Sequence, residues 1–317
     1  MTTNADRTGV LVMAYGTPRT PDEIEPYYTD IRRGRPPTPE ALADLVARYA
    51  AIGGVSPLAR LTEAQRDGLQ AALDEIEPDS YHVTLGLKHA DPKVEAGAAE
   101  LADAGFGAIV GVVLAPHYSS YSIGQYLQRT RDGVEGTGRA TPVTGVESWA
   151  VEPAFVDFIA ADLASRVEAM RSQVDGTVRV VFTAHSLPQR IIDAGDPYPD
   201  ELRATAEAVA GRAGLDEGDD WMIGWQSAGR TPEPWIGPDI LDVIDALGDD
   251  ESVGGVIVSA VGFVADHLEV LYDLDIEAAT RAEQAGLAFD RTACVNDEPS
   301  VMAALAARVH ALAVRTR

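Results

Sequence analysis

The chain has 317 residues, of which 46% are hydrophobic, so it is long enough for two domains of about 150 residues with sizeable cores. Its formal net charge of −25 makes nucleic acid and anionic membrane poor partners, because both carry negative charge themselves. The single cysteine, Cys294, excludes an intrachain disulfide and any site built from four cysteines.

The sequence predicts neither a leader nor a membrane span. The N-terminal residues reach an apolar run by Val10 without the charged, apolar and small-residue order of a signal peptide. The longest apolar run, residues 253–265, is interrupted by glycines and Ser259 and is shorter than the roughly 20 residues that a membrane helix needs. We therefore expect a cytoplasmic protein without stable membrane association.

Almost all of the 25 basic residues are arginines; the lysines are Lys88 and Lys93. Two explanations of this composition remain open. A GC-rich genome favours arginine over lysine. Alternatively, the acidic surface is an adaptation to high internal salt, which screens the repulsion between carboxylates.

Apolar runs and helical periodicities alternate along the chain. The runs that predict strands are residues 9–14, 82–87, 108–115, 142–147, 177–184, 221–226, 255–260 and 287–293. The stretches that predict helices include residues 39–51, 61–76, 94–104, 153–171, 199–211 and 299–314. Because strands that alternate with helices form parallel sheets covered on both faces, the sequence predicts an α/β fold.

The order of the elements is repeated in the second half of the chain. Segment 10–18 parallels 180–188, and segment 85–89 parallels 223–227. We therefore predict two doubly wound domains, each with a four-stranded parallel sheet, that face each other across a cleft. The predicted boundaries are 1–150 for the first domain, 151–298 for the second, and 299–317 for a helix that returns to the first.

Residues 20–60 fit neither repeat and form a predicted insertion in the first domain. The insertion holds a basic island in an acidic chain, with tyrosines among the arginines: Arg32, Arg33, Arg35, Arg48, Tyr27, Tyr28 and Tyr49. Aromatic rings contact the face of a flat ligand and guanidinium groups bind its carboxylates, so the insertion suits an anionic aromatic ligand. The alternative is a surface whose arginines only form ion pairs.

Two strands of the second half end in polar groups, at the edge where open α/β sheets bind ligands. His185 ends the first, and a neutral imidazole is a base near physiological pH. The second leads to Glu269, Asp273 and Glu277, whose spacing of four would place them on one face of a single helix. Such a row is either a solvated helix face or a path for cations or protons. Its position beside a strand end favours the path.

Several segments resemble the ferrochelatase family, and most closely the soluble coproporphyrin III ferrochelatases of Gram-positive bacteria. The segments are residues 13–18, 28–35, 184–188, 224–232 and 262–273. The resemblance implies two Rossmann-like domains and a lyase of haem biosynthesis that inserts ferrous iron into coproporphyrin III. The alternatives are protoporphyrin IX as the substrate, a chelatase for another metal or tetrapyrrole, and a non-catalytic tetrapyrrole carrier.

The resemblance also implies roles for individual residues. His185 and Glu269 match the catalytic pair that forms the inner metal site, and Asp273 and Glu277 match outer acidic residues that conduct metal or protons. Tyr15 matches an axial ligand on the opposite face of the porphyrin. The other matches line the porphyrin pocket: Arg32, Arg48, Tyr49, Ser56 and Tyr126.

For cofactors and partners, the resemblance implies Fe²⁺ as a substrate and no tightly bound cofactor. It implies no iron–sulfur cluster, because Cys294 alone cannot hold one. The expected state is a monomer in transient contact with neighbouring enzymes of the haem pathway. Residues 33–39 are polar and rich in proline where membrane-bound relatives carry an apolar lip, so we expect no membrane docking. Among the other histidines, His89, His117 and His267 are expected to have structural roles.

Overall fold

The computed structural model describes residues 3–229 and 231–316. Arg230, which belongs to the motif at 224–232, and Arg317, the last residue of the predicted C-terminal helix, lie outside the described residues. Contacts between Cα atoms divide the chain into two compact units. Unit 1 comprises Met1–Trp149 and Asn296–Arg317, and unit 2 comprises Ala150–Val295.

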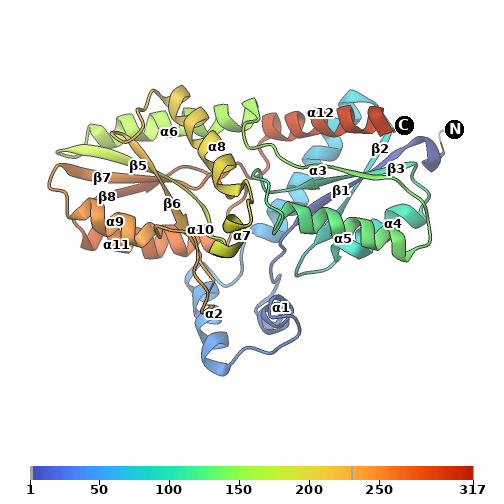
Figure 1. The fold of residues 1–317 in the computed structure, drawn as a ribbon, viewed down its shortest axis with the longest axis horizontal. Helices are drawn as coiled ribbons and strands as arrows, with labels where there is room; N and C mark the ends of the chain where they lie inside the picture. The colour runs from blue at the N-terminus through green and yellow to red at the C-terminus, as the bar shows by residue number, and fades with distance from the viewer. Residues whose placement is uncertain (1–2, 230, 317) are drawn as a thin grey trace. The chain divides into compact units, whose positions relative to one another are not determined.

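Unit 1 contains a four-stranded parallel sheet in the order β2-β1-β3-β4. Its strands are β1 (Thr8–Ala14), β2 (Tyr81–Leu87), β3 (Ala108–Val113) and β4 (Val143–Val146). Its main helices are α3 (Leu58–Ile76), α4 (Val94–Asp103), α5 (Ile123–Gly136) and α12 (Pro299–Thr316). Leu11 and Met13 pack against α4 and α5 on one face, and α3 and α12 lie together on the other (Figure 1). Because helices cover both faces, every residue of β1 is buried.

Unit 2 repeats this arrangement with the strand order β6-β5-β7-β8. Its strands are β5 (Thr177–His185), β6 (Trp221–Gln226), β7 (Val253–Ser259) and β8 (Ala288–Arg291). Its main helices are α6 (Pro153–Arg171), α8 (Tyr198–Ala213), α9 (Ile240–Gly248) and α11 (Ala279–Gln284), and the short α7 (Gln189–Asp193) follows β5. Helices α6 and α8 pack on one another, while α9 and α11 pack against Val181, Val256 and Val258 of the sheet (Figure 1).

The identical strand orders confirm the predicted α/β fold and its internal duplication. In both units the first strand lies second in the sheet, and the chain crosses over to add strands on each side of it. Strand bounds differ from the predicted ones by at most two residues, and those of β6 are identical. Within residues 3–229 and 231–316, none of the helices combines the length and apolar character that crossing a bilayer requires.

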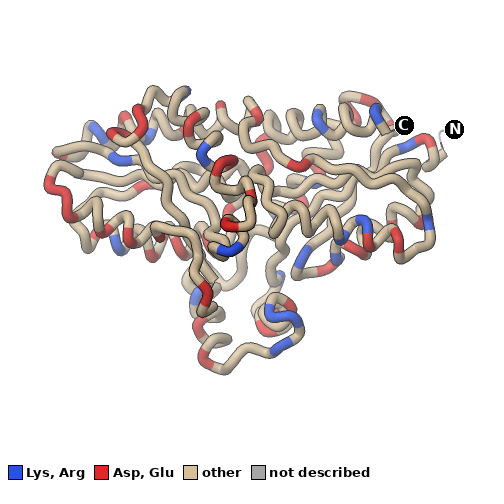
Figure 2. The backbone as a smooth tube through the Cα atoms, in the orientation of Figure 1, with Lys and Arg blue, Asp and Glu red and all other residues tan. Residues whose placement is uncertain are grey.

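The insertion in unit 1 carries η2 (Pro21–Glu23), α1 (Ile24–Ile31) and α2 (Pro39–Ala51). In Figure 1, α1 and α2 stand away from the sheet of unit 1. Helix α2 begins after Thr38, whose Oγ1 accepts a hydrogen bond from Ala41 N at 3.3 Å. Helix α1 ends where Arg33 and Gly34 adopt φ values of 57° and 81°, so the chain turns sharply there. Figure 2 shows the resulting group of basic residues at the end of α1.

The segment that carries Glu269, Asp273 and Glu277 is not one regular helix, and that prediction was wrong. It consists of α10 (Leu268–Leu271), the π-helix η3 (Asp273–Ala278) and α11. The wider turn is seen in the hydrogen bond from Glu277 N to Tyr272 O, which spans five residues at 2.9 Å. The three carboxylates therefore do not keep the phase of an α-helix. Residue spacing carries no signal for such an inserted turn.

Candidate active site

His185 is the last residue of β5, at the carboxyl edge of the unit 2 sheet. Its Nδ1 lies 2.5 Å from Ser186 O. Because a carbonyl oxygen only accepts hydrogen bonds, Nδ1 must be the donor. This leaves Nε2 as the ring atom that faces Glu269, at 3.7 Å from Oε1. The two side chains are 35% and 41% exposed, so a ligand can reach both.

Two hydrogen bonds, one from its own segment and one from the sheet, hold the backbone of Glu269. Its backbone N–H donates to His267 Nδ1 at 3.0 Å, which makes His267 the N-cap of α10, as predicted. Burial lowers the pKa of His267, so the ring is neutral and can accept this bond. Gln226 Nε2 donates to Glu269 O at 2.9 Å, while its Oε1 accepts from Thr183 Oγ1 at 2.8 Å.

A glycine allows the chain after β7 to approach β5. A Cβ atom at Gly262 would lie 2.4 Å from Ala184 Cβ, closer than any real contact. Gly262 N instead donates to Thr183 O at 3.0 Å, in the loop that leads to α10. The close approach brings the segment that carries Glu269 to the end of β5.

Asp273 and Glu277 do not join His185 and Glu269 in one ligand set. Asp273 is 9% exposed and accepts a hydrogen bond from Ser227 Oγ at 2.5 Å. Ser227 follows β6 with a φ of 59°, a conformation uncommon for a residue other than glycine. In the described part of the chain, no three His, Cys, Asp or Glu side chains converge into a group that could hold a metal ion.

Tyr15 follows β1 at the carboxyl edge of the unit 1 sheet, and 43% of it is exposed. Its ring centroid lies 4.6 Å from that of His89. Lys88 Nζ lies 5.9 Å from the Tyr15 ring and 5.5 Å from the ring of Tyr126. Burial lowers the pKa of Lys88 and raises that of Tyr126, so the Tyr126 phenol stays protonated.

Lys88 and His89 were not among the predicted site residues. His89 Nδ1 lies 3.3 Å from Asp30 Oδ1, and Lys93 Nζ lies 2.5 Å from Asp30 Oδ2, so the insertion is joined to the loop after β2. Burial lowers the pKa of His89 to about 4, which keeps the ring neutral beside Tyr15. A signal was present in the sequence, because Lys88 and His89 occupy the repeat positions of Gln226 and Ser227.

The predicted pocket residues of unit 1 have unequal exposure. Arg32 lies over the ring of Tyr28 at 5.6 Å, and Arg48 pairs with Asp44 at 3.5 Å. The other three are buried: Tyr49, Ser56 and Tyr126. The hydroxyl groups of Tyr49 and Thr17 share a hydrogen bond of 3.3 Å, and Ser56 Oγ accepts one from Leu58 N at 3.2 Å.

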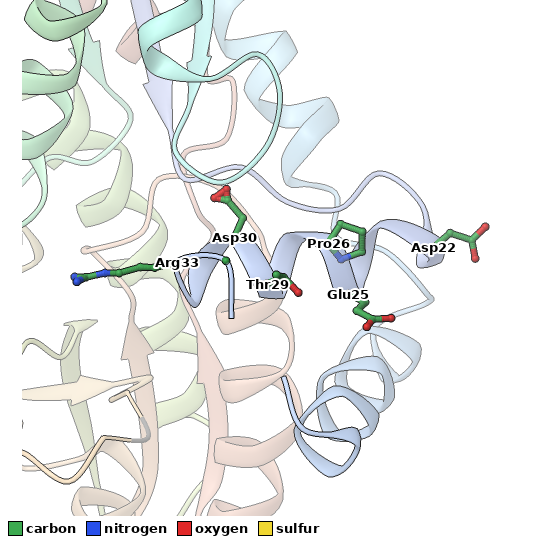
Figure 3. A pocket seen from close by; sticks show the side chains of 7 residues that line it. Asp22, Glu25, Pro26, Thr29, Asp30 and Arg33 are labelled. Carbon is green, nitrogen blue, oxygen red and sulfur yellow. The ribbon is translucent and has the colours of Figure 1, made fainter. Parts of the chain in front are cut away.

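A hollow of about 730 Å³ lies along α1. Its lining residues are Asp22, Glu25, Pro26, Thr29, Asp30, Arg33 and Gly34. Figure 3 shows Asp22 and Glu25 toward one end of α1, and Arg33 extending away from them at the other. The cationic residue of this lining is therefore Arg33, which shares its end of the hollow with Asp30.

Comparison with known proteins identifies the family of this chain. The family model described as Ferrochelatase matches residues 7–312. The chain belongs to the ferrochelatase family. The coproporphyrin III ferrochelatase of Bacillus pumilus is 44% identical over 301 residues, 95% of each chain. That of Geobacillus kaustophilus is 44% identical over 95% of this chain and 94% of the relative. That of Bacillus subtilis is 42% identical over 95% and 96%.

Solved structures of low identity share the fold. SirB from Bacillus subtilis with Fe³⁺ has a TM-score of 0.55 at 12% identity, covering 96% of this chain and 94% of that chain. CbiX, the terminal enzyme for siroheme biosynthesis in denitrifying bacteria, has a TM-score of 0.51 at 13% identity, covering 96% and 98%. Both likenesses agree with two Rossmann-like domains. As a ferrochelatase, the chain is a lyase whose substrates are a porphyrin and iron.

Proposed function

We propose that the chain inserts Fe²⁺ into coproporphyrin III, giving iron coproporphyrin III in haem biosynthesis. The names of the relatives support this porphyrin over others. The observation that carries the proposal is the pair of His185 Nε2 and Glu269 Oε1, 3.7 Å apart at the end of β5. Iron is a substrate of this reaction, and we propose that no tightly bound cofactor takes part.

Metal insertion requires two pyrrole protons to leave the macrocycle while the cation loses water. His185 suits proton removal because Nδ1 is engaged with Ser186 O, which directs Nε2 outward as the base. Glu269 offers a second proton acceptor beside it. An imidazole and a carboxylate bind a divalent cation less tightly than thiolates would, so the cation can be passed on.

Asp273 and Glu277 are proposed to relay cations or protons to this pair rather than to bind iron together with it. The lack of a three-residue metal group among the described residues supports this division. Asp273 is fixed by Ser227 and is nearly buried, whereas Glu277 is half-buried further along η3.

Unit 1 is proposed to hold the porphyrin. Tyr15 is the exposed ring at the strand edge and is proposed as the axial ligand from the opposite porphyrin face. Arg32 and Arg48 are proposed to bind propionates, because guanidinium groups match carboxylates in shape and charge. The buried Tyr49, Ser56 and Tyr126 are proposed to shape the pocket wall. Coproporphyrin III has four propionates, two more than protoporphyrin IX, so a cationic pocket favours it.

The proposal also covers the location and the oligomeric state of the protein. Carboxylates outnumber basic residues 50 to 25, which disfavours docking on an anionic membrane. We propose a cytoplasmic monomer that meets neighbouring pathway enzymes only transiently.

An anaerobic absorbance assay in detergent-free buffer tests the function. Coproporphyrin III and protoporphyrin IX are each offered with Fe²⁺ or Co²⁺, and His185→Ala is the control for uncatalysed metallation. We expect rapid insertion of Fe²⁺ into coproporphyrin III and much slower insertion into protoporphyrin IX. Equal rates with the two porphyrins, or preference for Co²⁺, would contradict the assignment. Tight porphyrin binding without metallation would indicate a carrier.

A further inference from the structure

Arg291, the last residue of β8, binds two carboxylates at once. Its Nε lies 2.5 Å from Asp275 Oδ1, and its Nη2 lies 3.0 Å from Asp275 Oδ2, which makes the pair bidentate. The same Nη2 lies 3.1 Å from Asp266 Oδ1. A third nitrogen, Nη1, donates to the carbonyl of Thr292 at 3.1 Å. Only 15% of the side chain is exposed.

The two carboxylates stand on either side of the candidate active-site segment. Asp266 precedes His267, the N-cap of α10, and Asp275 lies inside the π-helix η3. Glu269 and Asp273 lie between them in the sequence. A single guanidinium on β8 therefore ties both the start of this segment and its wide turn to the sheet of unit 2.

The segment needs an external positive charge. Residues 266–277 contain five carboxylates and no lysine or arginine, so their mutual repulsion opposes a compact helix. A π turn is also rare, because its wider ring packs less well than an α turn. Arg291 offsets both effects, since it neutralises the carboxylate in the π turn and fixes that carboxylate in a bidentate geometry.

Resting on the proposed function, we propose that Arg291 is a positioning residue for metal insertion. It holds η3 in the π conformation and so sets where Asp273 and Glu277 lie relative to Glu269. Arg291 does not touch the substrate in this proposal. Its effect passes through Asp275 and Asp266, and it concerns cation delivery rather than porphyrin binding.

The chain offers a matched control next to this segment. Arg281 in α11 forms a bidentate pair with Asp245 of α9, with both distances at 2.5 Å. The side chains of that pair are 45% and 41% exposed, and the pair joins α11 to α9. Exposed pairs of this kind contribute little to stability. Arg281→Gln therefore removes the same chemical group without touching the π turn.

The test compares Arg291→Gln, Arg291→Lys, Asp275→Asn and the double variant Arg291→Gln/Asp275→Asn with Arg281→Gln. For Arg291→Gln we expect the KM for Fe²⁺ to rise about tenfold while the Kd for coproporphyrin III stays within about twofold of wild type. Arg291→Lys should restore part of the loss. In the Asp275→Asn background, Arg291→Gln should have a much smaller effect, because the two residues act through one contact. Arg281→Gln should change neither constant by more than about twofold.

Hydrogen exchange followed by mass spectrometry tests the positioning directly and needs no turnover. Amides of residues 272–278 should exchange faster in Arg291→Gln and in Asp275→Asn, while those of α9 keep the wild-type rate. Unchanged exchange there, or an unchanged KM for Fe²⁺, would overturn the proposal. If Arg291→Gln does not fold, Arg291→Lys and Asp275→Asn decide the question by the same two measurements. Failure of the wild type to metallate coproporphyrin III would refute the proposed function but leave the exchange result interpretable.

Discussion

The two units share one strand order but end their strands with different chemistry. In unit 1 the edge carries Tyr15 and Lys88, which lie against one another, and Lys88 also lies over the buried ring of Tyr126. In unit 2 the equivalent positions carry His185 and Gln226, which face and fix Glu269. The scaffold determines where functional groups appear. In the proposed function, residue type then determines whether an edge binds an aromatic anion or transfers protons and cations.

The charges at the two edges are also opposite. Burial lowers the pKa of Lys88, and the nearby charges of Arg129 and Arg33 lower it further. The unit 2 edge instead carries Glu269 and the nearly buried Asp273. In the proposed reaction, the unit 1 edge binds the carboxylates of the porphyrin. The unit 2 edge accepts the pyrrole protons and delivers the iron. Substitutions in the two units should therefore affect different kinetic constants.

The largest effect is expected for His185, the proposed general base in unit 2. His185→Ala should lower the metallation rate at least about 100-fold, because general base catalysis is lost. The Kd for coproporphyrin III, measured by fluorescence quenching, should stay within about twofold. Tyr15→Phe, at the equivalent strand end in unit 1, should retain more activity than His185→Ala. Near-normal turnover of His185→Ala would remove the distinction between the two edges.

Within unit 2, Glu269→Gln should be more harmful than substitution further along the segment. It removes a charge and a proton acceptor 3.7 Å from His185 Nε2 while keeping the shape of the side chain. Asp273→Asn and Glu277→Gln should mainly raise the KM for Fe²⁺. Steady-state kinetics with varied Fe²⁺ measures all three. A larger loss in either outer variant would contradict the relay.

In unit 1, Arg32→Ala should weaken coproporphyrin III binding about tenfold, since one charge-assisted bond to a propionate is lost. Protoporphyrin IX binding should change less, so the preference between the two porphyrins narrows. The control is Arg139→Ala, which removes an exposed arginine paired with Asp103 at 3.6 Å. Titrations of both porphyrins into each variant give the four dissociation constants. An equal loss in the Arg139 variant would argue for a general charge effect.

The smallest effect concerns acid stability, because each unit has a histidine with a lowered pKa after its third strand. Burial lowers the pKa of His117 to about 3, and burial also lowers that of His267. Unfolding restores the ordinary value of 6.5, so the unfolded chain binds more protons below that pH. The stability contributed by neutral His117 is complete above about pH 6.5 and is lost as the pH falls toward 3.

Urea unfolding between pH 7 and pH 4 measures this dependence. His117→Gln should reduce the slope of the unfolding free energy by at most about 1.4 kcal/mol per pH unit. The same substitution at exposed His82 serves as the control. A slope unchanged by His117→Gln would show that the histidine is already neutral in the unfolded chain or charged in the folded one.

The sequence by itself determined the fold class and the edges at which the site would form. Apolar runs alternating with helical periodicities specify parallel strands, and the repeated order specifies two sheets of the same topology. Since parallel strands all end at one edge, polar residues such as Tyr15 and His185 could be placed there from their position after a run. These features are local, so periodicity and composition record them.

Only the tertiary structure decided which of these groups meet. His185 and Glu269 come from distant parts of the chain, and their contact depends on the close approach that Gly262 allows. Lys88 and His89 joined Tyr15 because β2 pairs with β1 in a register that the residues at the strand ends do not reveal. The π turn at Asp273–Ala278 and its pairing with Arg291 depend on a contact with β8. Such contacts arise from register and packing between distant segments. Apart from the repeat that aligns Lys88 and His89 with Gln226 and Ser227, no sequence pattern encodes them.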